Sequence, residues 1–481
     1  MQLTFIGLIQ LVFGGVIFFG GSLRHAVTFM IISGLFAGSA AIVLPGLGGS
    51  SIPPIQFACL IVYMRILAPR GGFLALLPEA IRANRWLALY TFYGVATAMI
   101  APRLFANQID VTPLRFDDAR TLFDTVPLAP STQNITTSVY MLGTFAVAVA
   151  AYLVTRLRGG VATVITAAIL VSWLHIVLGL LTAMAAGTPL NAVFEVMRNG
   201  SYAQLDQSVG GFVRIRGFFP ESSSYADFAF AYFTLNAELW YRSIWPRETG
   251  ITALALAILL VISTSSTAYL ALAAYLAFFI LRIIMMPHLA QLGRMKQLLV
   301  ATLAGLLVMS VAFLAAPQLL SSVSDMILHM TVDKSDSDSA QQRLFWAMQG
   351  LEAFKASYGL GVGPGSFRSS SLVTSMIGST GVAGCGAFLA YAYSVFQPTR
   401  HSSFGVSADL ALTIGGAFAT AALLALIPAC LIAPSADLGS NVALFAGVAV
   451  ALRPLAPPRQ APPVAAATDP GPALLPSAME G

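Results

Sequence analysis

The sequence predicts an all-α polytopic membrane protein, and three observations support this fold class. Only 9% of the 481 residues are charged, 57% are hydrophobic, and the mean hydropathy is +0.81. A soluble globular chain carries about 25% charged residues, so a soluble protein of this size could not cover its surface. The apolar residues also occur in runs of about 20, the length that spans a bilayer. These observations exclude a soluble enzyme, a disordered protein and a nucleic-acid-binding domain.

The hydrophobic segments predict about 12–13 transmembrane helices. Two segments, 54–69 and 249–263, are marginal for a bilayer about 30 Å thick, which leaves the number open between twelve and thirteen. The stretch 72–78 is too short to span and is expected to lie at the membrane interface. The complete set of segments is 3–21, 26–45, 54–69, 86–104, 137–155, 161–186, 224–241, 249–263, 267–285, 298–316, 372–396, 408–432 and 437–452.

The charges in the connections predict the orientation of the chain. Lysine and arginine concentrate in short connections, whereas most acidic residues lie in three long ones, 105–136, 187–223 and 317–371. Because positive residues are enriched in short cytoplasmic loops, the long connections are predicted to be extracytoplasmic. The last is the large loop between the third- and fourth-last helices. Residues 1–453 are expected to form the membrane domain, and the Pro/Ala-rich residues 454–481 a disordered cytoplasmic tail.

The cysteines and histidines predict no metal site and no cofactor. The three cysteines lie far apart inside apolar stretches, as buried hydrophobic residues do. The five histidines match no metal-ligand spacing. His175 lies mid-span and is expected to be a hydrogen-bonded core group. Arg65 and Glu238 lie near predicted cytoplasmic ends, where Arg65 can reach the interface and Glu238 can pair with a neighbouring helix.

The second long connection ends in a motif that leads directly into a membrane helix. Arg214 and Arg216 alternate, as in an extended strand that presents both side chains on one face. Glu221 follows a proline at a predicted helix start, where the helix dipole favours a carboxylate. Tyr225 lies one turn further on, and Asp227 just inside the membrane boundary. Either Glu221 only caps the helix and pairs with Arg216, or the arginines bind phosphate while Glu221 accepts a hydroxyl proton.

The third long connection contains an amphipathic helix followed by a glycine-rich turn. Apolar residues from Leu344 to Phe354 recur at helical spacing, and Asp336, Ser337 or Asp338 can cap this helix. Arg343 lies on its polar face, where it can meet lipid phosphates. The next segment, YGLGVGPGSFR, lets the backbone turn tightly and expose amides that can cradle phosphate. Between Arg343 and Arg368, this segment is a candidate diphosphate or glycan site; its glycines are Gly361, Gly363 and Gly365.

At these residues the chain resembles the O-antigen ligase and Wzy-type polysaccharide polymerase superfamily. The resemblance rests on the order of short motifs over about 215–385 and on the topology of the whole chain. The motifs are Arg216-Gly217-Phe218-Phe219-Pro220-Glu221-Ser222, the segment STSSTAYLAL from Ser263, and Arg343 followed by Gly361-Val362-Gly363-Pro364-Gly365. The resemblance implies a GT-C-like, metal-independent membrane glycosyltransferase of the cell inner (cytoplasmic) membrane. Its active face is expected to be extracytoplasmic (periplasmic).

Two departures from the ligase pattern favour the polymerase branch. Ligases similar to this family carry a histidine followed by one polar residue. Nine further residues and then a GxxG motif complete this pattern. Here the same frame reads Ser370-Ser371, residues 372–380, and Gly381-Val382-Ala383-Gly384, so the spacing is kept without the histidine. Such ligases also tend to have an arginine in the Ser/Thr-rich segment, where this chain has Ser265, Ser266 and Thr267.

The resemblance therefore implies a polymerase that joins polyprenyl-diphosphate-linked oligosaccharide repeat units at the outer face of the membrane. Glu221 is the candidate base, and Arg216 and Arg343 are the first candidates for the diphosphate. The candidate substrate-binding residues are Arg214, Arg368, Gly361, Gly363, Gly365, Tyr225 and Ser370. Expected partners are membrane lipids and the flippase and chain-length copolymerase of the same pathway.

Three alternatives stay open at this point. The first is a ligase that transfers finished glycan to an acceptor, and the second a flippase or transporter for lipid-linked oligosaccharide. A transporter often shows inverted repeats and a cavity lined by midspan charges. This sequence has no convincing repeat, and its charges crowd the predicted outer loops. The third alternative, a structural partner of a secretion complex, leaves the arginines and glycines unexplained.

Overall fold

The computed structural model describes residues 1–47, 50–68, 73–114, 123–200, 208–209, 212–315 and 338–455. Within these ranges, five helices are long and apolar enough to cross a membrane. They are α6 (Thr132–Thr155), α7 (Gly160–Met184), α11 (Ser266–Met285), α15 (Leu372–Phe396) and the consecutive pair α16 (Leu410–Leu424) and α17 (Leu426–Ile432). The predicted class, an all-α polytopic membrane protein, is confirmed; the number of 12–13 spans stays a prediction.

The remaining described helices are shorter or less apolar. The shorter apolar ones are α1 (Phe5–Gly20), α2 (Leu23–Ser33) with the 3-10 turn η1 (Gly34–Phe36), α3 (Pro54–Leu67) and α18 (Ser440–Leu452). The others are α4 (Leu77–Ala83), α5 (Arg85–Leu104), α8 (Leu190–Val196), α9 (Ser222–Tyr241), α10 (Pro246–Ile262), α12 (Leu292–Ala315) and α14 (Asp338–Ala356). The amphipathic helix expected in the third long connection is α14. Of its predicted caps, Asp336 and Ser337 lie outside the described residues, as does the tail after residue 455.

One predicted span is wrong. The sequence suggested a single helix over 26–45, but the helical part ends with η1 at Phe36. Residues Ile42–Leu44 instead form β2, the middle strand of a small antiparallel sheet with β1 (Gln2–Leu3) and β3 (Ser50–Ile52). The turn passes so close to the second long connection that the Gly38 amide donates to the Phe218 carbonyl at 2.7 Å. A Cβ at Gly38 would lie 2.7 Å from the same oxygen, so this backbone contact needs glycine.

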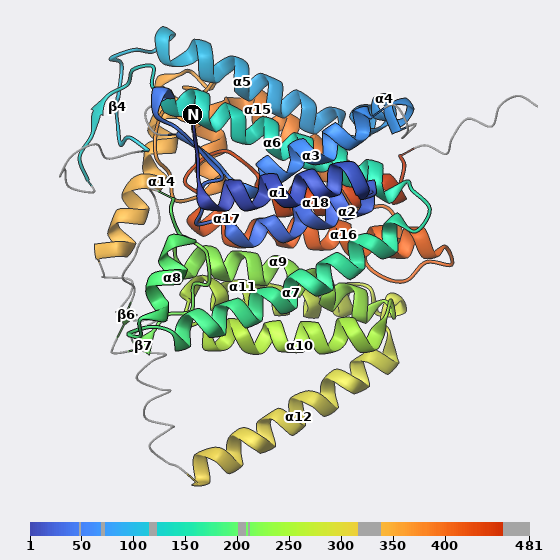
Figure 1. Cartoon of the computed structure of the whole chain (residues 1–481). Coiled ribbons are helices and arrows are strands. Elements are labelled where there is room, and N and C mark those ends of the chain that lie inside the picture. The colour runs from blue at the N-terminus through green and yellow to red at the C-terminus, as the bar shows by residue number, and fades with distance from the viewer. Residues whose placement is uncertain are drawn as a thin grey trace, which may run out of the picture.

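Parts of all three long connections meet at one end of the bundle, which we call the loop end. In Figure 1 this end carries α8, α14 and the short strand pairs β4 (Asp110–Val111) with β5 (Val126–Pro127) and β6 (Ser208–Val209) with β7 (Phe212–Val213). The Arg368 amide donates to the Thr112 carbonyl at 2.8 Å, which joins the first connection to the third. The Ser369 amide donates to the Pro434 carbonyl at 3.1 Å, which adds the loop between α17 and α18.

The short basic connections meet at the opposite end, which we call the turn end. Arg65 donates to the Gly21 carbonyl at 2.6 Å, and therefore holds the end of α1 as well as reaching the interface. Arg156 pairs with Glu79 at 3.2 Å, and Arg400 donates to the Pro454 carbonyl at 2.8 Å. The alternation of long and basic connections thus matches the two ends of the bundle. Which end faces the cytoplasm stays a prediction.

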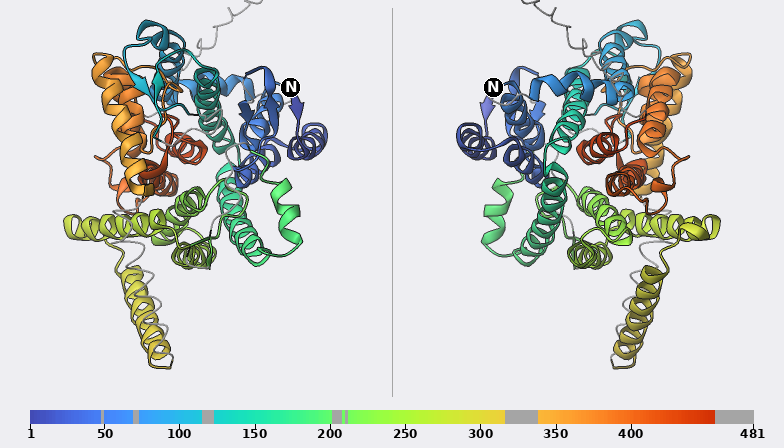
Figure 2. Two further views of the ribbon diagram at one scale, coloured as in Figure 1. Left: turned by 90° about the vertical axis from the view of Figure 1, so that its left-hand side faces the viewer. Right: turned by 90° about the vertical axis from the view of Figure 1, so that its right-hand side faces the viewer.

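Helix α9 lies at the centre of the bundle, whereas α12 diverges from it (Figure 1, Figure 2). α9 contacts α7, α10, α11, α16, α17 and α18, and almost every side chain along it is buried. Small residues allow similarly close packing elsewhere. On α18, for example, a Cβ at Gly447 would lie 2.3 Å from the Ala148 carbonyl of α6. The core is therefore a set of closely packed helices around α9.

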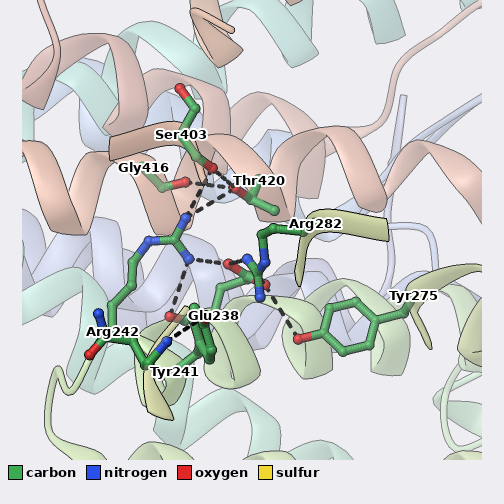
Figure 3. A network of polar contacts seen from close by, with 9 residues as sticks. Glu238, Tyr241, Arg242, Tyr275, Arg282, Ser403, Gly416 and Thr420 are labelled. Carbon is green, nitrogen blue, oxygen red and sulfur yellow. Dashed lines mark hydrogen bonds and ion pairs between the residues drawn. The ribbon is translucent and has the colours of Figure 1, made fainter. Parts of the chain in front are cut away.

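Glu238 ties the turn end of α9 to its neighbours (Figure 3). Its fully buried carboxylate accepts from Arg282 of α11 at 2.9 and 3.0 Å and forms an ion pair with Arg242. Arg242 in turn donates to the Ser403 carbonyl at 3.1 Å, and the Arg282 guanidinium lies 4.3 Å from the Tyr241 ring. The expected pairing of Glu238 with a neighbouring helix is therefore confirmed. One carboxylate therefore forms ion pairs with two buried arginines.

We expect Glu238→Gln to lower the free energy of unfolding by about 3–5 kcal/mol, because it leaves two buried guanidinium groups without a counter-charge. The measurement is thermal unfolding of the full chain in detergent. Arg156→Gln is the matched control, since it breaks an ion pair whose side chains are 43% and 47% exposed. Such a pair contributes at most about 1 kcal/mol. Equal losses in the two variants would contradict a special role for the buried network.

Candidate functional site

Arg214 and Arg368 lie near Glu221 at the loop end and Arg343 lies near Arg214, and we call these four residues the arginine cluster. Burial lowers the pKa of Arg214 and of Arg368, and the Glu221 carboxylate is close enough to both guanidinium groups to oppose this shift. Arg343 is close enough to Arg214 to lower its pKa. The tertiary structure thus brings together residues from the second and third long connections. One carboxylate faces three positive charges, so the cluster carries an excess of positive charge.

Helix α9 positions Glu221 as its N-cap residue. The backbone at Glu221 is extended, with φ −150° and ψ 165°, and the helix begins at Ser222. The carboxylate makes no capping hydrogen bond to the backbone; it accepts from the Ser223 hydroxyl instead. Glu221 therefore does not cap the helix through its side chain, and its charge acts on Arg214 and Arg368 through space.

The other members of the cluster are held by three separate elements. Arg214 donates to the Thr264 carbonyl at 3.4 Å, in the turn between α10 and α11. The guanidinium of Arg368 lies 4.3 Å from the ring of Trp346, one turn after Arg343 on α14. Ser370 donates its hydroxyl to the Arg343 carbonyl, which ties α14 to the segment before α15. Packing and hydrogen bonds therefore preorganise the cluster before any ligand binds.

Arg216 lies on the same segment as Arg214 but beside a different residue, Arg198. Arg216 is 9% exposed and Arg198 is 4% exposed. Burial and, to a lesser extent, the charge of Arg216 lower the pKa of Arg198 to about 10, against the opposing effect of Glu195. Arg198 also donates to the Gly217 carbonyl at 3.4 Å, within the turn that leads to α9. The expected strand that presents both arginines on one face is not what the structure shows: β7 ends at Val213, and the two side chains have different neighbours.

The sequence analysis missed Arg198. It belongs to the second long connection, as do Arg214 and Arg216, and its predicted position on the outer side was the signal that could have found it. Nothing in the local sequence indicates that it contacts Gly217, which lies 19 residues further on. The contact depends on the fold of the connection, in which the Gly200 amide donates to the Gly38 carbonyl at 3.0 Å.

The glycine-rich turn has a different role from the expected phosphate cradle. Its glycines have positive φ angles: +88° at Gly361, +93° at Gly363 and +86° at Gly365. The Gly361 amide donates to Ser357 Oγ, and the Gly363 amide to the Ser379 carbonyl, both at 2.9 Å. These two amides are therefore not available to a phosphate. A Cβ at any of the three glycines would lie 2.3–2.6 Å from a backbone oxygen, so the turn lets α14 and α15 pack against α5 and α6.

Tyr225 also differs from its expected role in substrate binding. It is 1% exposed, and its hydroxyl donates to the His175 carbonyl at 3.0 Å. Its ring stacks on the His175 ring with a centroid distance of 3.9 Å. Both residues are therefore core groups behind the turn at Gly217. His175 is a core residue as expected, but its ring Nε2 has no hydrogen-bond partner among the described residues.

We expect Gly361→Ala and Gly363→Ala to reduce the amount of folded protein but not its affinity for ligand. Alanine at a positive φ with a backbone oxygen in contact is strained by about 1–3 kcal/mol or more. The measurement is the thermal unfolding temperature in detergent, together with the amount of protein in the membrane. Gly386→Ala is the matched control, since that α15 glycine has open space around its Cβ position. Stable Gly361 and Gly363 variants with impaired ligand binding would reverse this interpretation.

Comparison with known families supports the resemblance inferred from the motifs. Residues 251–384 match the family model described as O-antigen ligase, which covers α10 to the kink of α15. The match includes Arg343, Arg368 and Ser370; it begins after Arg198 and Glu221 and therefore does not include them. Among curated proteins, none matches the chain. Residues 251–384 are therefore similar to the O-antigen ligase family, which supports the O-antigen ligase/Wzy superfamily.

Proposed function

We propose that this protein is a polysaccharide polymerase that joins polyprenyl-diphosphate-linked repeat units into an exported polysaccharide. Members of the superfamily are membrane glycosyltransferase-like enzymes, and their substrate is a lipid-linked oligosaccharide in a membrane. The observation that carries the proposal is a carboxylate, Glu221, that lies near Arg214 and Arg368, with Arg343 near Arg214. This arrangement offers one proton acceptor next to several fixed positive charges.

The proposed reaction transfers the glycan of one lipid-linked chain to another. An acceptor hydroxyl oxygen attacks the anomeric carbon of the donor, and a new glycosidic bond forms. The bond between that carbon and the diphosphate oxygen breaks, and the lipid diphosphate leaves with the bonding electron pair. Glu221 accepts the hydroxyl proton. Negative charge grows on the leaving diphosphate, so positive groups held in place beforehand favour the transition state over the ground state.

The arginines suit this leaving group because a guanidinium donates two parallel hydrogen bonds to phosphate oxygens and keeps its charge. Burial lowers the pKa of Arg214 and Arg368, and the Glu221 carboxylate opposes the effect in both. All of these groups remain protonated at neutral pH. We assign Arg343 and Arg216 first, then Arg214 and Arg368, to the diphosphate, and we add Arg198 through its contact with the turn after Arg216.

The position of the site favours chemistry at the outer face of the cell inner membrane. The cluster lies at the loop end, and the short basic connections lie at the turn end. The positive-inside rule places the turn end in the cytoplasm. The lipid carrier would then present its diphosphate at the membrane surface beside α9, after a flippase has moved it across. A chain-length copolymerase is the further proposed partner.

The test of function is the size distribution of surface and lipid-linked glycan in a strain that lacks this protein. We expect long polymer to vanish while single repeat units stay on the lipid carrier. Long polymer that persists on the carrier but never reaches its final acceptor would instead identify a ligase. Repeat units that accumulate only in the cytoplasmic leaflet would identify a transporter and contradict the enzyme.

Arg216→Lys and Arg343→Lys should each reduce polymer formation by about 10²–10³-fold, because a point charge does not replace the planar fork in a preorganised anion site. The measurement is the rate of polymer formation in membranes of the complemented strain. Arg103→Lys is the control: this exposed arginine at the loop end of α5 donates only to the Met99 carbonyl of its own helix. Wild-type rates in both test variants would move the diphosphate site away from these loops.

In the same assay, Glu221→Gln should reduce the rate by about 10²–10⁴-fold, the usual contribution of a positioned general base. Glutamine keeps the size of the side chain and removes its charge and basicity. The amount of protein in the membrane controls for folding. Full polymer yield in this variant would place the base elsewhere.

A further inference from the structure

Two adjoining cavities lie beside the loop end of α9, each of about 200 Å³. They share part of their lining, including Gly34, Ile55 and Ser440, so we treat them together as the acidic cavity. The walls come from the loop ends of α2, α3, α9 and α18, with Tyr140 of α6. The cavity is therefore built from the same end of the bundle as the arginine cluster.

The acidic cavity contains hydrogen-bond acceptors that lack donors. Gln56 is 9% exposed, and its Oε1 has no partner among the described residues, while its amide nitrogen donates to the Tyr140 carbonyl at 3.1 Å. Asp437 Oδ1 likewise has no partner within the described ranges. No hydrogen bond or ion pair to the Asp227 carboxylate is found in the part of the chain that the structure describes. Buried acceptors in folded proteins are almost always satisfied, so Gln56 Oε1 and Asp437 Oδ1 call for a donor from outside the chain, and the half-buried Asp227 carboxylate is a third acceptor beside them.

The remaining lining indicates what kind of donor fits. Phe219, Phe228 and Phe36 supply apolar faces, and Ser224, Ser440 and Asn441 supply small polar groups. Burial raises the pKa of Asp437 to about 6, and hydrogen-bonding groups near it oppose the rise, so this carboxylate is mainly ionised at neutral pH. A phosphate or another anion is therefore repelled. A sugar ring combines many hydroxyl donors with apolar C–H faces, which matches apolar walls that carry a few polar groups.

The position of the cavity relates it to the proposed reaction. Ser224 lies about one helical turn after Glu221. Asp227 lies six residues after Glu221, which is about 9 Å along the helix axis at 1.5 Å per residue. Phe219 lines the cavity, and its amide donates to the Arg216 carbonyl at 2.9 Å. Phe219 therefore connects the turn that carries Arg216 to the wall of the acidic cavity.

We infer that the acidic cavity binds the uncharged sugar residue that carries the attacking hydroxyl, with Asp227, Asp437 and Gln56 accepting its other hydroxyl groups. This inference rests on the proposed function, because it needs a donor diphosphate at the arginines. Separation by charge orients the two substrates: the diphosphate is drawn to the arginines, and the neutral acceptor sugar occupies the cavity. A volume of this size holds a sugar ring or two and excludes a whole oligosaccharide repeat.

The experiment compares two readouts in the full-length protein. The first is the binding of undecaprenyl diphosphate without sugar to protein in lipid nanodiscs, and the second is the glycan chain length in the complemented strain. Asp227→Asn removes an acceptor charge, and Ser224→Leu fills part of the cavity without changing charge. Asp110→Asn, an exposed carboxylate on β4 at the same end, is the matched control.

We expect Asp227→Asn and Ser224→Leu to bind undecaprenyl diphosphate as the wild type does. We expect the amount of glycan longer than one unit to fall by about tenfold or more in both variants, which is the effect of losing hydrogen bonds to a charged acceptor. Arg216→Ala should lose both readouts, and Asp110→Asn neither. Retained binding in the first two variants also shows that they fold.

Three results would overturn the inference. Wild-type chain length in both Asp227→Asn and Ser224→Leu means that the cavity takes no part in elongation. Loss of undecaprenyl diphosphate binding in Asp227→Asn, as severe as in Arg216→Ala, makes the cavity part of the donor site. If the purified wild-type protein holds a divalent metal ion in stoichiometric amount and Asp227→Asn lacks this ion, the cavity is a cation site. By contrast, wild-type behaviour of Arg216→Ala in both readouts refutes the proposed donor site itself.

Discussion

Helix α9 is buried along almost its whole length, so each charged group that it carries must find a partner inside the protein or bind something from outside. Glu238 meets this requirement with two arginines, Arg242 and Arg282. Glu221, at the other end, faces the arginines of the two long connections. Asp227 has no such partner among the described residues and opens into the acidic cavity. The three carboxylates of one helix thus mark a structural network, a proposed reaction centre and a proposed acceptor site.

The same central helix explains why conformationally demanding glycines gather around the site. The turn before α9 passes Gly38 so closely that backbone meets backbone, and the turn before α15 does the same with α5 and α6 through Gly363 and Gly365. These contacts hold the arginine-bearing segments against the bundle. A preorganised site needs such support, because a charge that moves with its loop cannot favour the transition state selectively. The glycine-rich motif therefore contributes to the site through packing, and the motif alone did not reveal this.

The separation of charge at the loop end connects the two proposals. Arginines from the second and third long connections concentrate positive charge around Glu221, and the carboxylates of Asp227 and Asp437 line a cavity behind the same turn. A reaction between two similar lipid-linked glycans needs a means to place one as donor and the other as acceptor. Opposite charges at two sites that one turn connects provide that distinction, since one substrate presents a diphosphate and the other a hydroxyl.

The sequence alone determined the fold class, most helix positions and the resemblance to the O-antigen ligase family, because hydrophobic runs of bilayer length and the order of short motifs are local properties of the chain. It also indicated Glu221 and four of the arginines through their predicted side of the membrane. Only the tertiary structure decided that Arg198 lies beside Arg216, that Tyr225 and the glycines serve packing, and that the helical segment of α2 and η1 ends at Phe36. These features depend on contacts between segments far apart in the chain, such as Gly38 with Phe218 and Asp437 with the cavity beside α9. Periodicity and spacing carry no information about such contacts, since they describe each segment without its neighbours.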